Sequence, residues 1–233
     1  MKHIALVSAA ALGLSAAAAS AATIMDTDSF GPSLTEFASS SASSVNPLSG
    51  PINASALELD LFDSSLGTLT SVEVMLTGGF TSEGTVLNSS TGAQTANAQE
   101  DATFFFSSTM FVDTNFTAGD ATGFQSFASG PAGTAVDLGA TESTTFNPGT
   151  TGYSGAAGDT FLIDFGTLVG TSFQGGGGNL TFDVDTLGTV EAKVTYTFDE
   201  AAPVVVVPTV PLPAGALLLG TALFGLGFAR RKS

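Results

Sequence analysis

The sequence predicts an all-β fold, an antiparallel β-sandwich of jelly-roll or immunoglobulin-like type, between an N-terminal signal helix and a C-terminal transmembrane helix. Three observations predict it. Short segments of the central region alternate between apolar and polar residues, which is the period of a half-buried strand. Stretches rich in Gly, Ser, Thr and Pro separate these segments, and no amphipathic helix longer than two turns lies among them. A barrel is the alternative to a sandwich.

The first segment, residues 1–21, predicts a removable secretion signal. Met1-Lys2-His3 is a short basic start, and an apolar stretch with an alanine run follows it. Ala19-Ser20-Ala21 has the small-x-small pattern that signal peptidase accepts, so the expected cut follows Ala21. A permanent transmembrane helix is the alternative, but the apolar core is short for one. Because His3 is the only histidine of the chain, we expect the processed protein to contain none.

Residues 22–202 predict the β domain. Leucines alternate with acidic residues over 57–61, and three apolar residues share one strand face over 69–77. The aromatic-rich segment 103–112 and the mostly apolar segment 161–165 are predicted to be further strands. The chain has 19 phenylalanines against two tyrosines and no tryptophan, so we expect phenylalanine to supply much of the core.

The last two strands of this domain are predicted to form a hairpin. Apolar and polar residues alternate over 180–185 and again over 190–199, and Leu187-Gly188 lies between the two runs. A short gap that contains glycine is typical of a hairpin turn. Such a hairpin would bring Lys193 near Asp183 on the outer face and offset the repulsion between acidic side chains there.

The last segment, residues 203–233, predicts a membrane anchor. No charged residue occurs between positions 201 and 229, and residues 210–229 are long enough to cross a bilayer once as a helix. The basic cluster that follows, Arg230-Arg231-Lys232, is expected to stay in the cytoplasm. This orientation places the acidic domain outside the cytoplasm, in agreement with the signal segment.

A proline-bearing motif, Val210-Pro211-Leu212-Pro213-Ala214, opens the anchor segment. An ordinary single-pass anchor, which is the alternative, does not require it. The motif, the apolar helix and the basic end together resemble the VPLPA form of the PEP-CTERM sorting signal. This resemblance implies recognition by an exosortase, a membrane-embedded transpeptidase of bacteria with an outer membrane. That enzyme would remove the helix and the basic end and transfer the protein from the inner membrane to a carrier in the cell envelope or extracellular matrix.

The central region resembles a second family, the choice-of-anchor E domain. The resemblance rests on Phe62-Asp63, on Leu66-Gly67-Thr68-Leu69 shortly after it, and on the late pattern Tyr196-Thr197-Phe198. It extends over roughly residues 23–200. That family has no assigned catalytic activity, so the resemblance assigns no catalytic residue to this chain.

The charge distribution and the missing residue types exclude several functions. All 21 acidic residues lie in the central region, with Lys193 as its single basic residue. Such a surface repels nucleic acids and anionic membranes. A processed domain without His, Cys or Arg has no Ser-His-Asp triad, cysteine nucleophile or histidine metal site. We therefore expect no enzyme activity, and a carboxylate-based glycoside hydrolase is the least favoured function.

Two acid-x-acid pairs are weak candidates for a calcium site. Asp26 and Asp28 form one pair, and Asp183 and Asp185 form the other; residues two apart share one face of a strand. Neither pair matches an EF-hand loop, so we expect no obligatory cofactor. The sequence predicts a non-catalytic cell-surface or extracellular-matrix protein. A carbohydrate- or calcium-binding module on the cell envelope is the alternative, with exopolysaccharide as a candidate partner.

Overall fold

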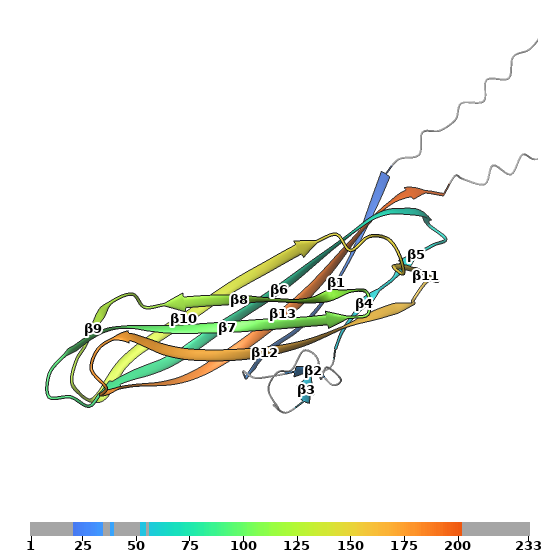
Figure 1. Ribbon diagram of the computed structural model, residues 1–233. Helices are drawn as coiled ribbons and strands as arrows, with labels where there is room; N and C mark the ends of the chain where they lie inside the picture. Colours follow the sequence, from blue (N-terminus) through green and yellow to red (C-terminus); the bar gives the residue numbers. More distant parts are fainter. Residues whose placement is uncertain (1–20, 35–37, 40–51, 55, 202–233) are drawn as a thin grey trace, which may run out of the picture. The chain divides into compact units, whose positions relative to one another are not determined.

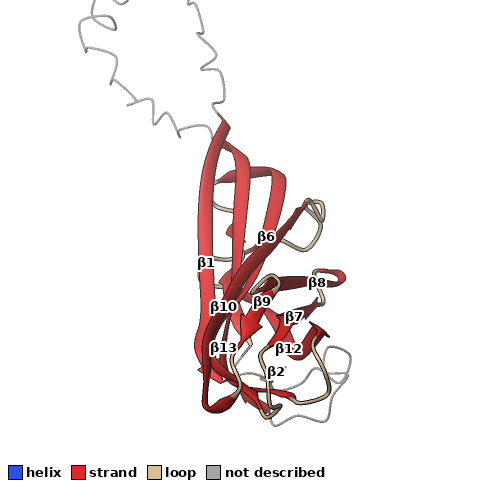
Figure 2. Cartoon of the chain, turned by 90° about the vertical axis from the view of Figure 1, so that its left-hand side faces the viewer, coloured by secondary structure: helices blue, strands red, loops and turns tan. Residues whose placement is uncertain are grey.

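All regular elements of the described chain are β-strands (Figure 2). The computed structural model describes residues 21–34, 38–39, 52–54 and 56–201. The predicted all-β class is therefore confirmed for the central domain. The two predicted terminal helices lie outside the described residues. Within the described ranges, we find no helix with the length and apolar character needed to span a bilayer.

Two sheets make up most of the domain, and all their strand pairs are antiparallel except the short parallel pair β2–β3 (Figures 1 and 2). The first has the strand order β1-β13-β6-β10, with β1 (Ala21–Leu34), β6 (Gly67–Asn88), β10 (Gly130–Phe146) and β13 (Leu180–Glu200). The second is built on three long strands, β7 (Gln94–Ser108), β8 (Phe111–Ala121) and β12 (Thr160–Gly175). Its short strands are β2 (Ala38–Ser39), β3 (Ile52–Ala54), β4 (Leu57–Asp60) and β9 (Gln125–Phe127). Two further short strands, β5 (Phe62–Asp63) and β11 (Ser154–Gly155), pair with each other.

A single hydrophobic core lies between the two sheets. Alternate residues of β6, β7, β12 and β13 point into it, as the period of two along a strand requires. Phenylalanine is its most frequent residue, as expected from the composition. The buried phenylalanines are Phe62, Phe80, Phe104, Phe106, Phe127, Phe161, Phe165 and Phe198.

The predicted final hairpin is wrong, because β13 is one continuous strand of 21 residues. Gly188 makes no turn; it lies opposite Phe80 of β6. The even-numbered residues face the core both before and after Gly188, so a single strand buries the whole apolar series. Lys193 consequently does not approach Asp183, and its cross-strand neighbours are Thr27 of β1 and Met75 of β6.

A hairpin occurs instead inside the segment 103–112, which was predicted as one strand. β7 ends at Ser108 and β8 begins at Phe111, and these two residues face each other across the turn. Neither Thr109 nor Met110 is a typical turn residue, and the one turn signal is Ser108, whose hydroxyl oxygen accepts the backbone N–H of Met110 at 3.3 Å. The turn is also held from outside the hairpin, because the Tyr153 hydroxyl donates a hydrogen bond of 3.1 Å to the Met110 carbonyl oxygen.

Both tyrosines of the chain are buried, and this gives a spectroscopic test of the fold. Burial raises the pKa of Tyr153 to about 12. Burial also raises the pKa of Tyr196, with smaller effects of Tyr153 and of the Asp26 and Asp60 carboxylates. The folded state thus holds both phenolic protons more tightly than the unfolded state. This contribution to stability is complete below the ordinary tyrosine pKa, about 10, and is lost as the pH rises from there through about 12.

We therefore expect no tyrosinate absorbance in the native protein near pH 10 and a single cooperative rise, coincident with unfolding, at higher pH. In concentrated urea, both groups should titrate near pH 10. The tyrosinate absorbance is simple to interpret, because the chain has two tyrosines and no tryptophan. Independent titration of either tyrosine near pH 10, while circular dichroism remains native, would show that its ring is not buried.

Candidate functional site

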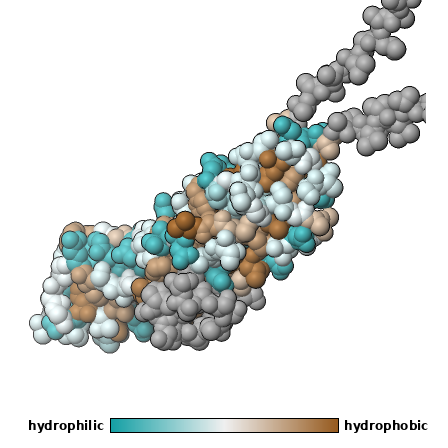
Figure 3. Space-filling view, turned by 45° about the vertical axis from the view of Figure 1, so that its right-hand side comes forward, coloured by the Kyte–Doolittle hydropathy of each residue, from teal (hydrophilic) through white to brown (hydrophobic). Residues whose placement is uncertain are grey.

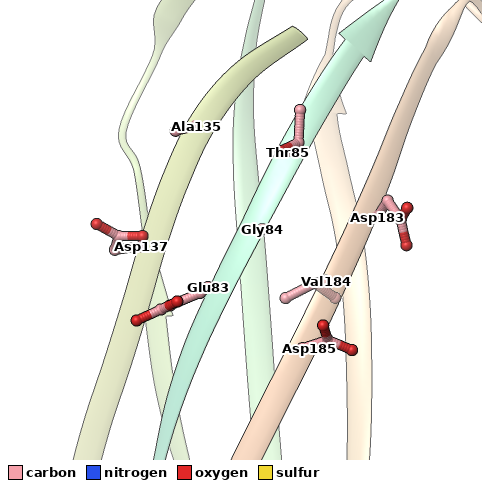
Figure 4. A pocket seen from close by; sticks show the side chains of 8 residues that line it. All are labelled: Glu83, Gly84, Thr85, Ala135, Asp137, Asp183, Val184 and Asp185. Atoms are coloured by element: carbon pink, nitrogen blue, oxygen red, sulfur yellow. The ribbon is translucent and has the colours of Figure 1, made fainter.

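The candidate residues Asp183 and Asp185 lie on an acidic outer face of the first sheet (Figure 4). Glu83 of β6 stands directly opposite Asp185 on one side and Asp137 of β10 on the other. Three carboxylates therefore form a row across three neighbouring strands, and Asp183 lies two residues from the end of this row. The row borders a shallow hollow of about 400 Å³ whose lining has no basic side chain.

This acidic row resembles a cation site in charge but not in geometry. Like charges in directly opposed strand positions repel each other, and a divalent cation would relieve that repulsion. In the part of the chain that the structure describes, however, no three acidic, histidine or cysteine side chains are close enough together to hold a metal ion. The sequence identified Asp183 and Asp185 but missed Glu83 and Asp137, which join them only through the register of the sheet.

The other candidate pair, Asp26 and Asp28, has a structural role at the edge of the first sheet. One oxygen of Asp26 accepts the backbone N–H of Asp60 at 2.7 Å, and one oxygen of Asp28 accepts the N–H of Glu58 at 2.8 Å. The second oxygen of each carboxylate accepts the N–H of the following residue. Both carboxylates are thus already occupied by protein donors.

These hydrogen bonds join the two sheets along one side. Asp26 and Asp28 belong to β1, the edge strand of the first sheet, whereas β4 pairs with β12 of the second. The N–H groups of Glu58 and Asp60 in β4 thereby have carboxylate acceptors, and strand edges with free polar groups invite wrong pairing. The two aspartates therefore close this edge of the domain, and the structure does not bring them together with Asp183 and Asp185.

The segments on which the resemblance to the choice-of-anchor E domain rests, residues 62–69 and 196–198, lie close together in the structure. The ring of Phe62 lies 5.9 Å from that of Tyr196 and 4.9 Å from that of Phe198, measured between centroids. Asp63 accepts the backbone N–H of Ser65 at 2.8 Å, and this hydrogen bond lowers the pKa of the Asp63 carboxyl group. Residues 62–69 and 196–198 therefore form a packed corner, which contains a tight turn and lies beside the end of β13.

Position 67 in this corner requires glycine, because the chain there closely approaches β13. Gly67 has a φ of 156°, and a Cβ atom added there would overlap the carbonyl group of Asp199. The Leu66 carbonyl oxygen accepts the N–H of Ala201 at 2.9 Å, which fixes the chain just after β13. These residues hold the end of the last strand in place, so their geometry points to packing rather than chemistry.

The processing residues fall at and beyond the boundaries of the described chain. Ala21, which precedes the expected signal cut, is the first residue of β1 and lies opposite Asp199 of β13. The others lie outside the described residues: Ala19, the motif residues Val210, Pro211, Leu212, Pro213 and Ala214, and the basic residues Arg230, Arg231 and Lys232.

Comparison with known proteins gives no family. No family model matches the chain, and no curated protein sequence matches it. Among solved structures, the chain is similar to one in the structure of infectious bursal disease virus Gt strain, with 11% sequence identity and a TM-score of 0.11. The alignment covers 88% of this chain and 47% of that one, so the chain spans about half of its length. A likeness at this TM-score carries no argument about fold or function.

Proposed function

We propose that this chain is an exported, non-catalytic protein of the cell surface or extracellular matrix, and that an exosortase-type transpeptidase processes it at its VPLPA motif. One observation carries the proposal. The β domain begins at Ala21, where the signal cut is expected, and β13 ends at Glu200, shortly before the sorting motif. The folded unit thus fits between the two processing segments.

The pairing of the chain ends supports the same order of events. Ala22, the first residue after the expected cut, pairs with Phe198 in the last strand of the domain. Signal peptidase acts on an extended, accessible segment, so its cut would come before β1 joins β13. The residues from 202 to 209, fully extended, reach at most roughly 30 Å. The domain can therefore fold close to the membrane surface while the motif stays at the bilayer.

The proposal includes the finer features of the architecture. The domain is a β-sandwich of the choice-of-anchor E type, preceded by a signal helix and followed by a transmembrane helix. The protein passes through the inner membrane and reaches the envelope surface or matrix of a bacterium with an outer membrane. The contacts of the described residues support a structural domain, since Asp26, Asp28 and both tyrosine hydroxyls bind backbone groups.

The intact mass of the protein recovered from cells and medium tests the proposal. We expect a mature form that lacks the residues before Ala22 and those after the 210–214 motif, with any surplus mass equal to that of the carrier. A variant with Pro211→Ala and Pro213→Ala should keep its C-terminal segment. Pro208→Ala, just outside the motif, is the matched control and should be processed normally. Mature envelope protein that retains residues 217–233 would overturn the sorting mechanism.

A further inference from the structure

One end of the two sheets is free of charged residues. Residues 84–99, 121–136 and 165–182 contain no Asp, Glu, Lys or Arg, although the domain is strongly acidic elsewhere. These segments carry the chain between the sheets, from β6 to β7, from β8 through β9 to β10, and from β12 to β13. We define the neutral tip as residues 88–96, 122–131 and 174–180. It lies at the β9 end of Figure 1, opposite the end where β5 and β11 lie.

The neutral tip is distant from both chain ends of the domain. β13 starts at the tip with Leu180 and ends at Glu200, and its 21 residues span roughly 65 Å at about 3.3 Å per residue. Ala21 lies opposite Asp199 at the same far end. A protein attached through its C-terminus would therefore present the tip away from the attachment point.

A buried asparagine fixes two of the three tip segments. The Asn88 amide nitrogen donates to the carbonyl oxygens of Gly92 at 3.0 Å and of Phe127 at 2.8 Å. Its amide oxygen accepts from the Ser90 backbone N–H at 3.0 Å and from the Ser90 hydroxyl at 2.6 Å. This side chain makes all the hydrogen bonds an amide can make, so it holds the turn after β6 against β9.

The third segment is tied to the first by further hydrogen bonds. Gln94 accepts the backbone N–H of Gly177 at 3.1 Å through its side-chain oxygen. The Asn179 carbonyl oxygen accepts both the backbone N–H of Ser89, at 3.0 Å, and the Ser89 hydroxyl, at 3.1 Å. A surface ordered in advance loses little conformational entropy when it binds a ligand. The tip is therefore preorganised, although much of it is loop.

Two features of the tip surface suit a polar but uncharged ligand. The ring of Phe124 is 64% exposed, and it flanks Gly175, which has no side chain to cover it. A hollow of about 510 Å³ opens on the tip, and its lining comprises Leu87, Asn88, Ser89, Ser90, Gly130 and Pro131. Residues of intermediate hydropathy cover much of the surface in Figure 3, in keeping with the abundance of Gly, Ser and Thr.

We propose that the neutral tip binds an uncharged polysaccharide, with a sugar ring on the face of Phe124 and sugar hydroxyl groups on the hydroxyl and amide groups of the loops. Exposed aromatic rings beside polar groups match the amphipathic faces of sugars. The acidic row of Glu83, Asp137 and Asp185 lies five or six residues from the tip along β6, β10 and β13. Its charge disfavours the approach of anionic polymers and so favours uncharged ones. This inference goes beyond the proposed function and does not depend on C-terminal processing.

A second copy of the chain fits the tip less well. Two copies would bring strongly acidic domains together, and a stable interface buries about 800 Å² on each partner. A single exposed phenylalanine supplies only a fraction of that area. Polysaccharide binding needs no such area, because a sugar unit can bind through one aromatic face and a few polar groups.

Binding of the full chain to a panel of soluble polysaccharides tests the proposal. The chain is purified in a detergent without a sugar headgroup, and affinity electrophoresis compares uncharged polymers, such as dextran, laminarin and galactomannan, with anionic alginate. We expect retardation by at least one uncharged polymer and none by alginate. Phe124→Ala should weaken binding about tenfold, and Phe124→Trp should strengthen it. Val112→Ala, at a position 86% exposed near the opposite end, is the matched control and should bind normally.

Several outcomes would overturn this assignment. They are no retardation by any uncharged polymer, equal binding by Phe124→Ala and the parent, and a preference for alginate. Concentration-dependent dimers that Phe124→Ala abolishes, without polysaccharide binding, would assign the tip to self-association instead. Phe124 is largely exposed, so unchanged melting temperatures should show that the variants remain folded.

Discussion

Replacing Gly78 by alanine should lower the free energy of unfolding by about 3 kcal/mol. Gly78 is buried in the middle of β6, and a Cβ atom there would lie closer than 3.0 Å to three ring atoms of Phe104. The Phe104 ring is 1% exposed and packs against Phe116, with 5.8 Å between ring centroids. Because a close-packed core offers the ring no free volume, the added methyl group must displace either the ring or the strand.

A second substitution and a control make this test specific. Phe104→Leu should restore part of the loss in the Gly78→Ala background, since the smaller side chain makes room for the methyl group. The two changes together should then cost less than the sum of their separate effects. Gly170→Ala is the control, because its Cβ would meet nothing within 4 Å on an exposed part of β12. Equal urea midpoints for Gly78→Ala and Gly170→Ala would contradict the packing described for Phe104.

Replacing Thr186 by valine should cost a similar amount, about 3 kcal/mol, because it leaves a buried carboxyl group without a hydrogen bond. Glu100 of β7 is 0% exposed, and one of its oxygens accepts a hydrogen bond from the Thr186 hydroxyl of β13. Its other oxygen has no hydrogen-bond partner among the described residues. The Ser82 hydroxyl of β6 donates to Thr186 at 3.1 Å, so this polar contact links both sheets.

Removal of both polar partners should be far less harmful than removal of one. Valine has the shape of threonine, and methionine has nearly the volume of glutamate, so Glu100→Met with Thr186→Val replaces the hydrogen bond by an apolar contact. We expect the double variant to recover at least about 2 kcal/mol relative to Thr186→Val in urea unfolding. A double variant as unstable as Thr186→Val alone would mean that the lost threonine hydroxyl, rather than the unpaired carboxyl group, causes the instability.

The sequence predicted the fold class because alternation reports directly which strand face is buried. Leu57 and Leu59 are buried and Glu58 and Asp60 are exposed, as the alternation predicted. Turns were less predictable. Gly188 is of a residue type that favours turns but lies within an extended strand, whereas the hairpin turns at Thr109 and Met110, which are not typical turn residues. Apolar residues occupy even-numbered positions both before and after Gly188, and this unbroken alternation was the sequence feature that indicated a single strand.

The candidate sites were less predictable because they depend on contacts between distant residues. Glu100 lies between the polar residues Gln99 and Asp101, so its residue type suggested an exposed side chain. The alternation with Ala98 and Ala102, however, places it on the buried face of the strand. The row that joins Glu83 to Asp137 and Asp185 follows from sheet register alone. The neutral tip is visible in the sequence only as three separate uncharged stretches, which the topology gathers at one end.

The position of β13 in the first sheet also determines how the domain would carry a mechanical load. β13 is the strand that leads to the C-terminal segment, and it is paired along both edges, with β1 on one side and β6 on the other. A pull applied at Glu200 and resisted at the neutral tip would act along this strand. The two ladders would then be loaded in shear, so many hydrogen bonds would have to break together instead of one after another. If the protein is attached by its C-terminal segment and its tip holds a polymer, as we propose, the β domain would therefore resist unfolding under tension.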